Sequence, residues 1–144
     1  MILDSQLSLS RNQAIQSAGS TVVSTDHYDT GSNADVGIGE ELYLQIAIGD
    51  TAVTGGTSVQ FVLQTDDNAG FSSAKTIPLT AAIAVASLTA RSVVYQGRLP
   101  VGMERYFRVG YTSVGTTTAG TANAFLAKDL HIAPSIATTV PSVK

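Results

Sequence analysis

Hydrophobic and polar residues alternate along much of this chain with a period of two, the pattern of β-strands that have one buried face. In residues 41–49, every even position from 42 to 48 holds Leu or Ile, and in residues 59–64 the odd positions hold Val, Phe and Leu. The loop between these segments contains Gly55 and Gly56. The two segments are therefore predicted to form a β-hairpin with a rather long loop.

Further extended segments follow at intervals of roughly 8–12 residues, the spacing expected of a β-sandwich or jelly roll. In residues 105–112, the alternation predicts that Phe107, Val109 and Tyr111 point inward and the intervening residues outward. Pro78 cannot donate to a ladder and predicts an edge strand around it. The remaining candidates are residues 20–25, 75–80, 92–99 and 122–132, with 81–90 compatible with either a helix or a strand. The predicted fold class is all-β, a jelly-roll-like antiparallel β-sandwich.

The two ends of the chain differ in composition from its middle. Residues 1–19 are rich in Ser, and residues 133–144 contain Pro and Thr. Both are predicted to be extended segments. Residues 10–13 also match a capping box, which would start one helical turn. The predicted regions are an N-terminal arm (1–19), a β-sandwich domain (20–132) and a C-terminal tail (133–144).

The composition points to a weakly charged surface. Charged residues make up 13% of the chain, about half of the usual ~25%. With 8 basic against 11 acidic residues and a net charge of −3, there is no basic row that would bind nucleic acid. No stretch approaches the ~18 apolar residues of a membrane span, and the N-terminus lacks the pattern of a signal peptide. We expect a protein made in the cytoplasm that lies against other protein.

Few residues are arranged for catalysis or metal binding. His27 and His131 are the only histidines and lie far apart, and the acidic residues near His27 favour a turn over a metal site. Residues 65–70 cluster oxygen ligands before Gly70 but lack the spacing of an EF-hand, so a turn is favoured over a calcium site. The chain has no Cys and no Gly-x-Ser-x-Gly motif. We therefore expect no enzyme, no catalytic residues, no metal and no cofactor.

Arg and Tyr side chains gather in the segment 105–112. These residue types anchor many protein interfaces, because the Arg fork grips carboxylates and Tyr buries a large ring. An ordinary exposed strand would have the same residues, so both interpretations stay open. Apolar residues of the terminal segments are further candidates, since such segments can add a strand to a neighbour. The candidate partner-contact residues are Leu7, Leu9, Arg105, Tyr106, Arg108, Tyr111, Ile136 and Val140.

Several short motifs follow one another along the chain: MILD (1–4), VGIGEELY (36–43), VLQTDD (62–67), FSS (71–73), AIAVASL (82–88), LPVGMERYFRV (99–109) and TAG (118–120). Their order resembles that in the capsid cement, or decoration, proteins of tailed bacteriophages, of the Bordetella-phage type. The resemblance runs from residue 1 to about 132, and the tail after residue 133 has no counterpart in it.

This resemblance implies a jelly-roll domain on the outer surface of an icosahedral capsid in the virion. Its implied partners are the major capsid protein, whose subunits it links, and further copies of itself in a homo-dimer or homo-trimer. It implies no catalytic residues.

Two other classes of function remain as alternatives. A carbohydrate- or host-surface-binding module of a phage virion would normally use stacked aromatic rings, and this chain has no Trp and 6% aromatic residues. A small jelly-roll enzyme of the cupin type would need clustered His and carboxylate ligands, and the two histidines are distant in sequence.

Overall fold

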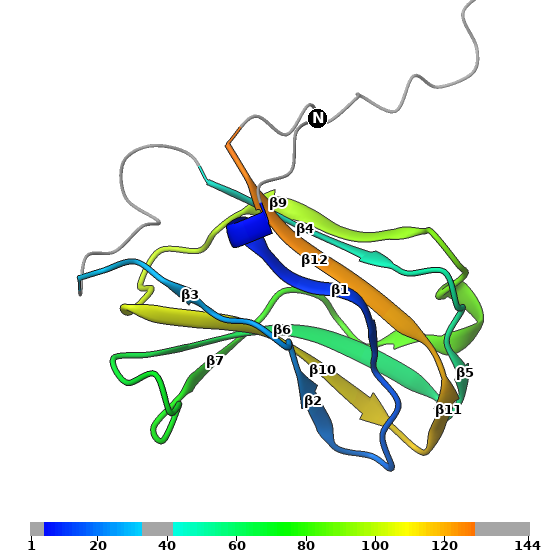
Figure 1. Ribbon diagram of the computed structural model, residues 1–144. Helices are drawn as coiled ribbons and strands as arrows, with labels where there is room; N and C mark the ends of the chain where they lie inside the picture. The colour runs from blue at the N-terminus through cyan, green and yellow to red at the C-terminus, as the bar shows by residue number, and fades with distance from the viewer. Residues whose placement is uncertain (1–4, 33–41, 129–144) are drawn as a thin grey trace, which may run out of the picture.

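The strands assort into two main antiparallel sheets that face each other (Figure 1). The computed structural model describes residues 5–32 and 42–128. The first sheet has the order β1 (Ser8–Ala14), β12 (Thr121–Ala127), β4 (Tyr43–Ile48) and β9 (Val93–Arg98). The second has the order β2 (Thr21–Val23), β10 (Tyr106–Val114), β6 (Ser58–Asp66) and β7 (Lys75–Pro78), with β3 (Tyr28–Asp29) on β10 and β8 (Ile83–Ala84) on β6.

Shorter elements complete the described structure. The strands β5 (Thr54–Gly55) and β11 (Thr117–Ala119) form a small third sheet. Two single-turn 3₁₀ helices are η1 (Ser5–Leu7) and η2 (Val85–Ser87).

The pairing of the main strands is nested, as in a long hairpin that has been folded over. Strand β1 pairs with β12, β2 with β10, β4 with β9, and β6 with its sequence neighbour β7. Cross-pairs of β12 with β4 and of β10 with β6 then join these hairpin layers into two sheets. This is the topology of a jelly roll, and the predicted fold class is confirmed.

The core lies between the two sheets and consists of the residues that the alternation assigned to it. In the first sheet, Leu44, Ile46 and Ile48 are at most 1% exposed, and in the second sheet Phe107 and Val109 are fully buried. Because successive strand side chains point to opposite faces, one row of each strand fills the space between the sheets. The other core members include Val59, Phe61, Leu63, Tyr111, Ala122, Ala124 and Leu126.

The predicted hairpin between residues 41–49 and 59–64 is wrong. Strand β4 belongs to the first sheet and β6 to the second, so the segment between them crosses the edge of the sandwich. Alternation identifies the buried face of a strand but not its partner, and two strands facing each other across a core have the same pattern as two strands side by side. The long loop is the part of the sequence that fits this crossing.

The capping-box match at residues 10–13 does not start a helical turn, since these residues belong to β1. Asn12 has a φ of 43° and forms a bulge in which its N–H donates to Asn123 Oδ1 at 2.7 Å. Its own Oδ1 accepts the N–H of Asp50 at 2.9 Å. The two bonds fix the Asn12 backbone N–H and side chain against β12 and the segment that follows β4.

The sandwich therefore begins inside the predicted N-terminal arm. Leu9 and Ile15 are each 1% exposed and belong to the core, so the predicted boundary at residue 20 does not separate an arm from the domain. At the other end, β12 ends at Ala127, and residues 129–132 of the predicted strand and the tail 133–144 lie outside the described residues.

The other segments predicted to be extended form short strands and one 3₁₀ turn. The predicted strands at 20–25, 75–80 and 92–99 correspond to β2, β7 and β9, and β7 is an edge strand, as Pro78 indicated. The ambiguous segment 81–90 contains the two-residue strand β8 followed by the 3₁₀ turn η2.

One buried hydrogen bond joins the two sheets through the core. The Tyr111 hydroxyl of β10 donates to Ser10 Oγ of β1 at 2.8 Å, and Ser10 donates in turn to Gln13 Oε1 at 2.7 Å. The Tyr111 ring also meets Phe61 edge to face at 5.9 Å between centroids. Burial raises the pKa of the Tyr111 phenol far above its usual range, outweighing the opposite effect of Ser10.

We predict that Tyr111→Phe lowers the free energy of unfolding at neutral pH by about 1 kcal/mol, the usual net worth of such a hydrogen bond. A raised pKa means that the wild type loses stability as the pH rises above the unfolded value near 10, by up to ~1.4 kcal/mol per pH unit. The variant lacks this loss, so the two unfolding free energies should converge in alkali. Urea denaturation between pH 7 and 11 measures this.

A matched control is Tyr28→Phe, because the Tyr28 ring packs on Phe107 while its hydroxyl has no hydrogen bond among the described residues. A difference between wild type and Tyr111→Phe that stays constant with pH would contradict the prediction.

Candidate interaction surface

The outer face of the second sheet has the most distinctive group of side chains in the described structure. Because β10 alternates, Tyr106 and Arg108 point away from the core that holds Phe107 and Val109. Arg108 lies opposite Gln64 of β6 in the ladder, and its Nε–H donates to Gln64 Oε1 at 2.8 Å. This hydrogen bond fixes the direction of the guanidinium along the sheet.

Phe71 forms the platform on which Arg108 lies. The Arg108 guanidinium carbon is 4.1 Å from the centroid of the Phe71 ring, a cation–π contact. Phe71 is 9% exposed and has a φ of 51°, a left-handed conformation that costs a bulky residue about 1–2 kcal/mol. Such strain persists only where surrounding contacts hold it in place.

The turn that positions Phe71 is held by Asp66 at the end of β6. The Asp66 carboxylate accepts the backbone N–H groups of Asn68 at 3.1 Å and Ser73 at 2.8 Å. Burial would raise the pKa of Asp66, but these N–H groups outweigh it and the pKa is lowered. The segment 65–70 is thus a strand-ending turn, as predicted.

Two more rings extend this surface. His27, which is exposed in the turn between β2 and β3, contacts Phe71 and Tyr106 edge to face, with centroids 5.8 Å apart in each case. Arg105 lies over the Tyr106 ring at 5.0 Å. We call these five residues, His27, Phe71, Arg105, Tyr106 and Arg108, the Arg–aromatic patch.

Arg105 is fixed by a carboxylate of its own chain. Its Nε and Nη2 donate to the two Asp29 oxygens at 2.8 Å and 3.1 Å, a bidentate pair that joins β10 to β3. The hydrogen bond from Arg105, helped by the backbone N–H of Gly31, lowers the pKa of Asp29 to about 2.

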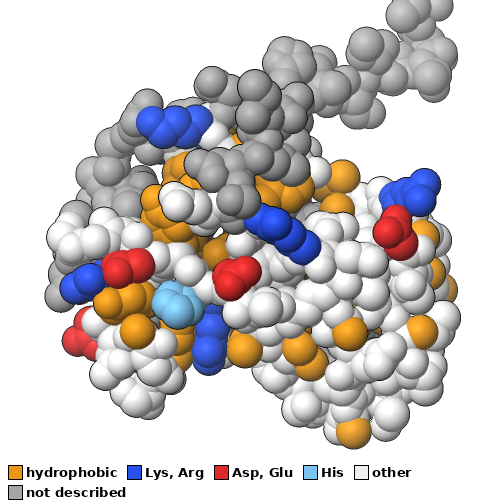
Figure 2. Space-filling view, in the orientation of Figure 1, with side chains coloured by type: hydrophobic (Ala, Val, Ile, Leu, Met, Phe, Trp, Pro, Cys, Tyr) orange, Lys and Arg blue, Asp and Glu red, His pale blue; other side chains and the backbone are white. Residues whose placement is uncertain are grey.

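Charges of both signs surround the patch. Lys75 of β7 forms an ion pair with Glu104, which raises the pKa of Lys75. Figure 2 shows basic, acidic and hydrophobic side chains gathered around a histidine in the left half of the view, whereas the right half is mainly white. On the face shown in Figure 2, charged side chains are thus most numerous at the end of the sandwich where β3 and β7 lie (Figure 1).

The structure brings together some of the predicted contact residues and separates others. Arg105, Tyr106 and Arg108 meet in one surface. Leu9 and Tyr111 are 1% and 0% exposed, so their side chains fill the core and are not available to a partner. Leu7 is partly buried against the core, and Ile136 and Val140 lie outside the described residues.

Sequence reasoning missed Phe71 as part of this surface. An isolated Phe between Gly70 and Ser72 has the appearance of a loop residue, and its contact with Arg108 depends on how the loop folds back. His27 was interpreted as a turn residue, and it does lie in a turn, but its contacts with two aromatic rings come from separate elements.

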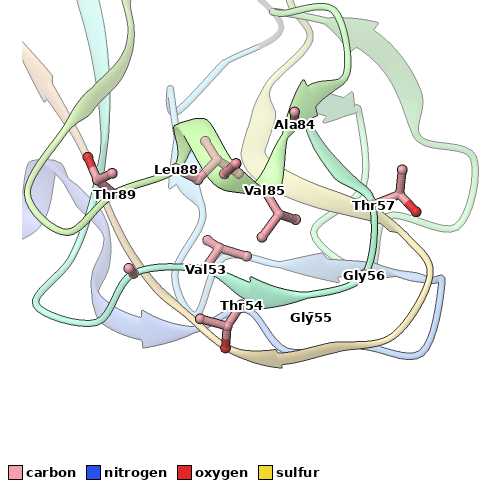
Figure 3. Close-up of a pocket in the computed structure, with 11 residues that line it drawn as sticks. Val53, Thr54, Gly55, Gly56, Thr57, Ala84, Val85, Leu88 and Thr89 are labelled. Carbon is pink, nitrogen blue, oxygen red and sulfur yellow. The ribbon is translucent and has the colours of Figure 1, made fainter.

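A shallow hollow of about 550 Å³ lies at the opposite end of the sandwich, between β5 and η2. Figure 3 shows the Val53 and Val85 side chains turned toward each other next to Leu88. The residues that line it are uncharged. It therefore offers van der Waals contact and threonine hydroxyls rather than ionisable groups.

Within residues 5–32 and 42–128, no three His, Cys, Asp or Glu side chains are grouped so that they could hold a metal ion. The same ranges contain no helix with the length and hydropathy needed to traverse a bilayer.

The topology and the composition of the outer face define a small jelly-roll β-sandwich with a candidate protein-binding surface. The chain belongs to the Bbp16 family, a family of Bordetella phage proteins, whose model matches residues 9–126. The match begins in β1 and ends in β12, so it spans both sheets. Among curated proteins, none matches the chain.

We predict that Arg105→Gln moves the Asp29 pKa from about 2 toward its ordinary value of 3.8, stopping short of it because the Gly31 N–H remains. The lowered pKa means that this carboxylate stabilises the fold above its unfolded pKa, and that the contribution is lost as the pH falls through about 2. Carboxyl carbon shifts followed by NMR measure the titration. Arg91→Gln, which removes an exposed partner of Asp50, is the matched control. An unmoved Asp29 titration in Arg105→Gln would refute the assignment.

Proposed function

We propose that this protein is a capsid cement protein, which binds the outer surface of an icosahedral phage shell and stabilises it by linking major capsid subunits. The observation that carries the proposal is the Bbp16 family match across the whole sandwich. The match covers the whole folded domain and not a single motif, so the relation to phage proteins applies to the entire sandwich. In the same proposal, the protein is not an enzyme, and it works in the virion as a homo-dimer or homo-trimer.

The surface chemistry supports a role in assembly. Arg and aromatic side chains, which make up the Arg–aromatic patch, are enriched at protein interfaces. Elsewhere the chain has few charges, with 13% charged residues in total. A weakly charged surface loses little hydration free energy when it is covered by another protein.

A cement function needs only preferential binding to the assembled shell. Any ligand that binds the intact state and not the dissociated one stabilises it, by about 2.7 kcal/mol at a free concentration 100 times Kd. A protein that contacts two neighbouring subunits gains this preference directly, because its complete site exists only after assembly.

The sandwich also has sheet edges that suit such contacts. Strands β1 and β9 are the edges of the first sheet. An edge strand can accept an extended segment of a neighbour through main-chain hydrogen bonds. In this proposal, terminal segments and sheet edges of adjacent copies or shell subunits make the links.

The carbohydrate-binding alternative receives less support from the patch. A sugar stacks on the open face of an aromatic ring, but Arg108 covers one face of Phe71 and Arg105 lies over Tyr106. These rings are thus already occupied by cations of the same chain.

The proposed function predicts that purified protein, added to capsids that lack it, binds them and raises their temperature of rupture. Binding is measured by co-sedimentation and rupture by release of a DNA-sensitive dye during heating. Dissociated capsid subunits serve as the control and should bind more weakly. Absence of binding, or binding that leaves the rupture temperature unchanged, would refute the cement function.

A further inference from the structure

Arg108 differs from the other cations near it in having no carboxylate partner. Arg105 pairs with Asp29, and Lys75 pairs with Glu104. Among the described residues, no carboxylate lies within ion-pair distance of Arg108; its Nε–H is used by the neutral amide of Gln64. Its terminal nitrogens donate no hydrogen bond to any of these residues.

The acidic group that acts on Arg108 electrostatically, Asp66, is hydrogen-bonded to backbone N–H groups of its own turn. Asp66 attracts Arg108 electrostatically, but its oxygens accept the N–H groups of Asn68 and Ser73. Asp66 is also 0% exposed. It therefore lowers the cost of placing a cation nearby without occupying the guanidinium fork.

The surroundings of Arg108 hold its side chain in one direction at some cost. Burial lowers its pKa, which reflects the loss of water around the cation. One side of the guanidinium plane lies on Phe71 at 4.1 Å, and Nε is fixed by Gln64. Phe71 itself has a left-handed backbone conformation. The strained Phe71 and the hydrogen bond to Gln64 therefore both help to orient the Arg108 guanidinium. A partner that binds it meets a side chain already ordered, which lowers the entropic cost of association.

We propose that Arg108, seated on Phe71, is the anchor that receives a carboxylate side chain of the shell protein. This inference rests on the proposed function and specifies the chemistry of its partner. The planar fork presents two parallel N–H donors, which match the two oxygens of an Asp or Glu side chain. Phe71 is a positioning residue that keeps the fork aligned.

A protein carboxylate fits this site better than a phosphate of nucleic acid. Nucleic acid is bound by rows of cations, each neutralising one phosphate. Here the neighbouring cations are paired within the chain, and Asp29, Asp66 and Glu104 lie on the same end of the sandwich. Only Arg108 is left to be neutralised among these cations, and a single carboxylate is sufficient to do so.

The first experiment compares binding of variants to purified capsids that lack the protein. Arg108→Gln should weaken binding about tenfold or more, since losing one member of a buried charge pair is costly. Phe71→Leu keeps an apolar side chain but removes the ring, and should give a smaller loss. Arg91→Gln, which removes an exposed cation at the other end, should bind like the wild type. Melting of each isolated variant checks that it is folded.

The second experiment identifies the partner group. In Arg108→Lys, a carbodiimide should join the new amine to a shell carboxylate in contact with it, and peptide mapping should find position 108 linked to an Asp or Glu of the shell. Arg108→Gln should give no such link. The natural lysines Lys75, Lys128 and Lys144 provide an internal comparison, because their links do not depend on position 108.

The outcomes separate this inference from the proposed function. If wild type binds and stabilises capsids but Arg108→Gln and Phe71→Leu bind equally well, the anchor is refuted and the cement function stands. If position 108 cross-links to a second copy of this chain, or if capsid DNA competes for it, the shell carboxylate is refuted. If wild type does not bind at all, the proposed function fails first.

Discussion

The ladder between β6 and β10 is the constraint on which both faces of the second sheet depend. It pairs every residue from Tyr106 with Asp66 to Val114 with Ser58, without a register shift. The inner face of this ladder joins Phe61 to Tyr111, and its outer face joins Gln64 to Arg108. A slip of one residue would move the core side chains outward and bury the arginine. The core and the candidate surface are therefore fixed by the same pairing.

The ladder tolerates little substitution at its centre. Gly110 lies opposite Val62, and a Cβ atom there would come within 2.8 Å of Val62 Cγ2 and 3.1 Å of Thr21 Cγ2. The absent side chain lets Val62 fold over the outer face, where it is only 4% exposed. The patch therefore lies beside a flat part of the sheet rather than beside a further row of side chains.

The sequence was sufficient to predict properties that depend on near neighbours. Period-two alternation identified the buried face of β4, β6 and β10, and Pro78 identified an edge, because each of these signals is local. The strand partners were not predictable in this way: β4 and β6 are consecutive long strands, yet they lie in opposite sheets. Similarly, the Asn12 bulge depends on Asn123 and Asp50, which are remote in sequence.

In the candidate surface, too, the residues close in sequence were predictable and those brought together by the fold were not. Arg105, Tyr106 and Arg108 could be found from one segment, since they lie within four consecutive residues at the start of β10 and directly before it. The role of Phe71 could not, because it depends on a turn capped by Asp66 and on contacts with β10 and with the connection between β2 and β3. Tyr111 was assigned both to the core and to the contact surface, and its burial decides for the core.

Nested pairing also has a consequence for the order in which the chain can fold during synthesis. Among the described strands, β1 pairs only with β12, and the hydrogen bond from Asn12 to Asn123 spans 111 residues. The first strand must therefore wait, unpaired, until nearly the whole described chain has left the ribosome. Contacts of such long sequence separation slow folding. Once formed, they place β1 and β12, the first and last of the described strands, side by side, so that a force on either strand acts on the same pairing.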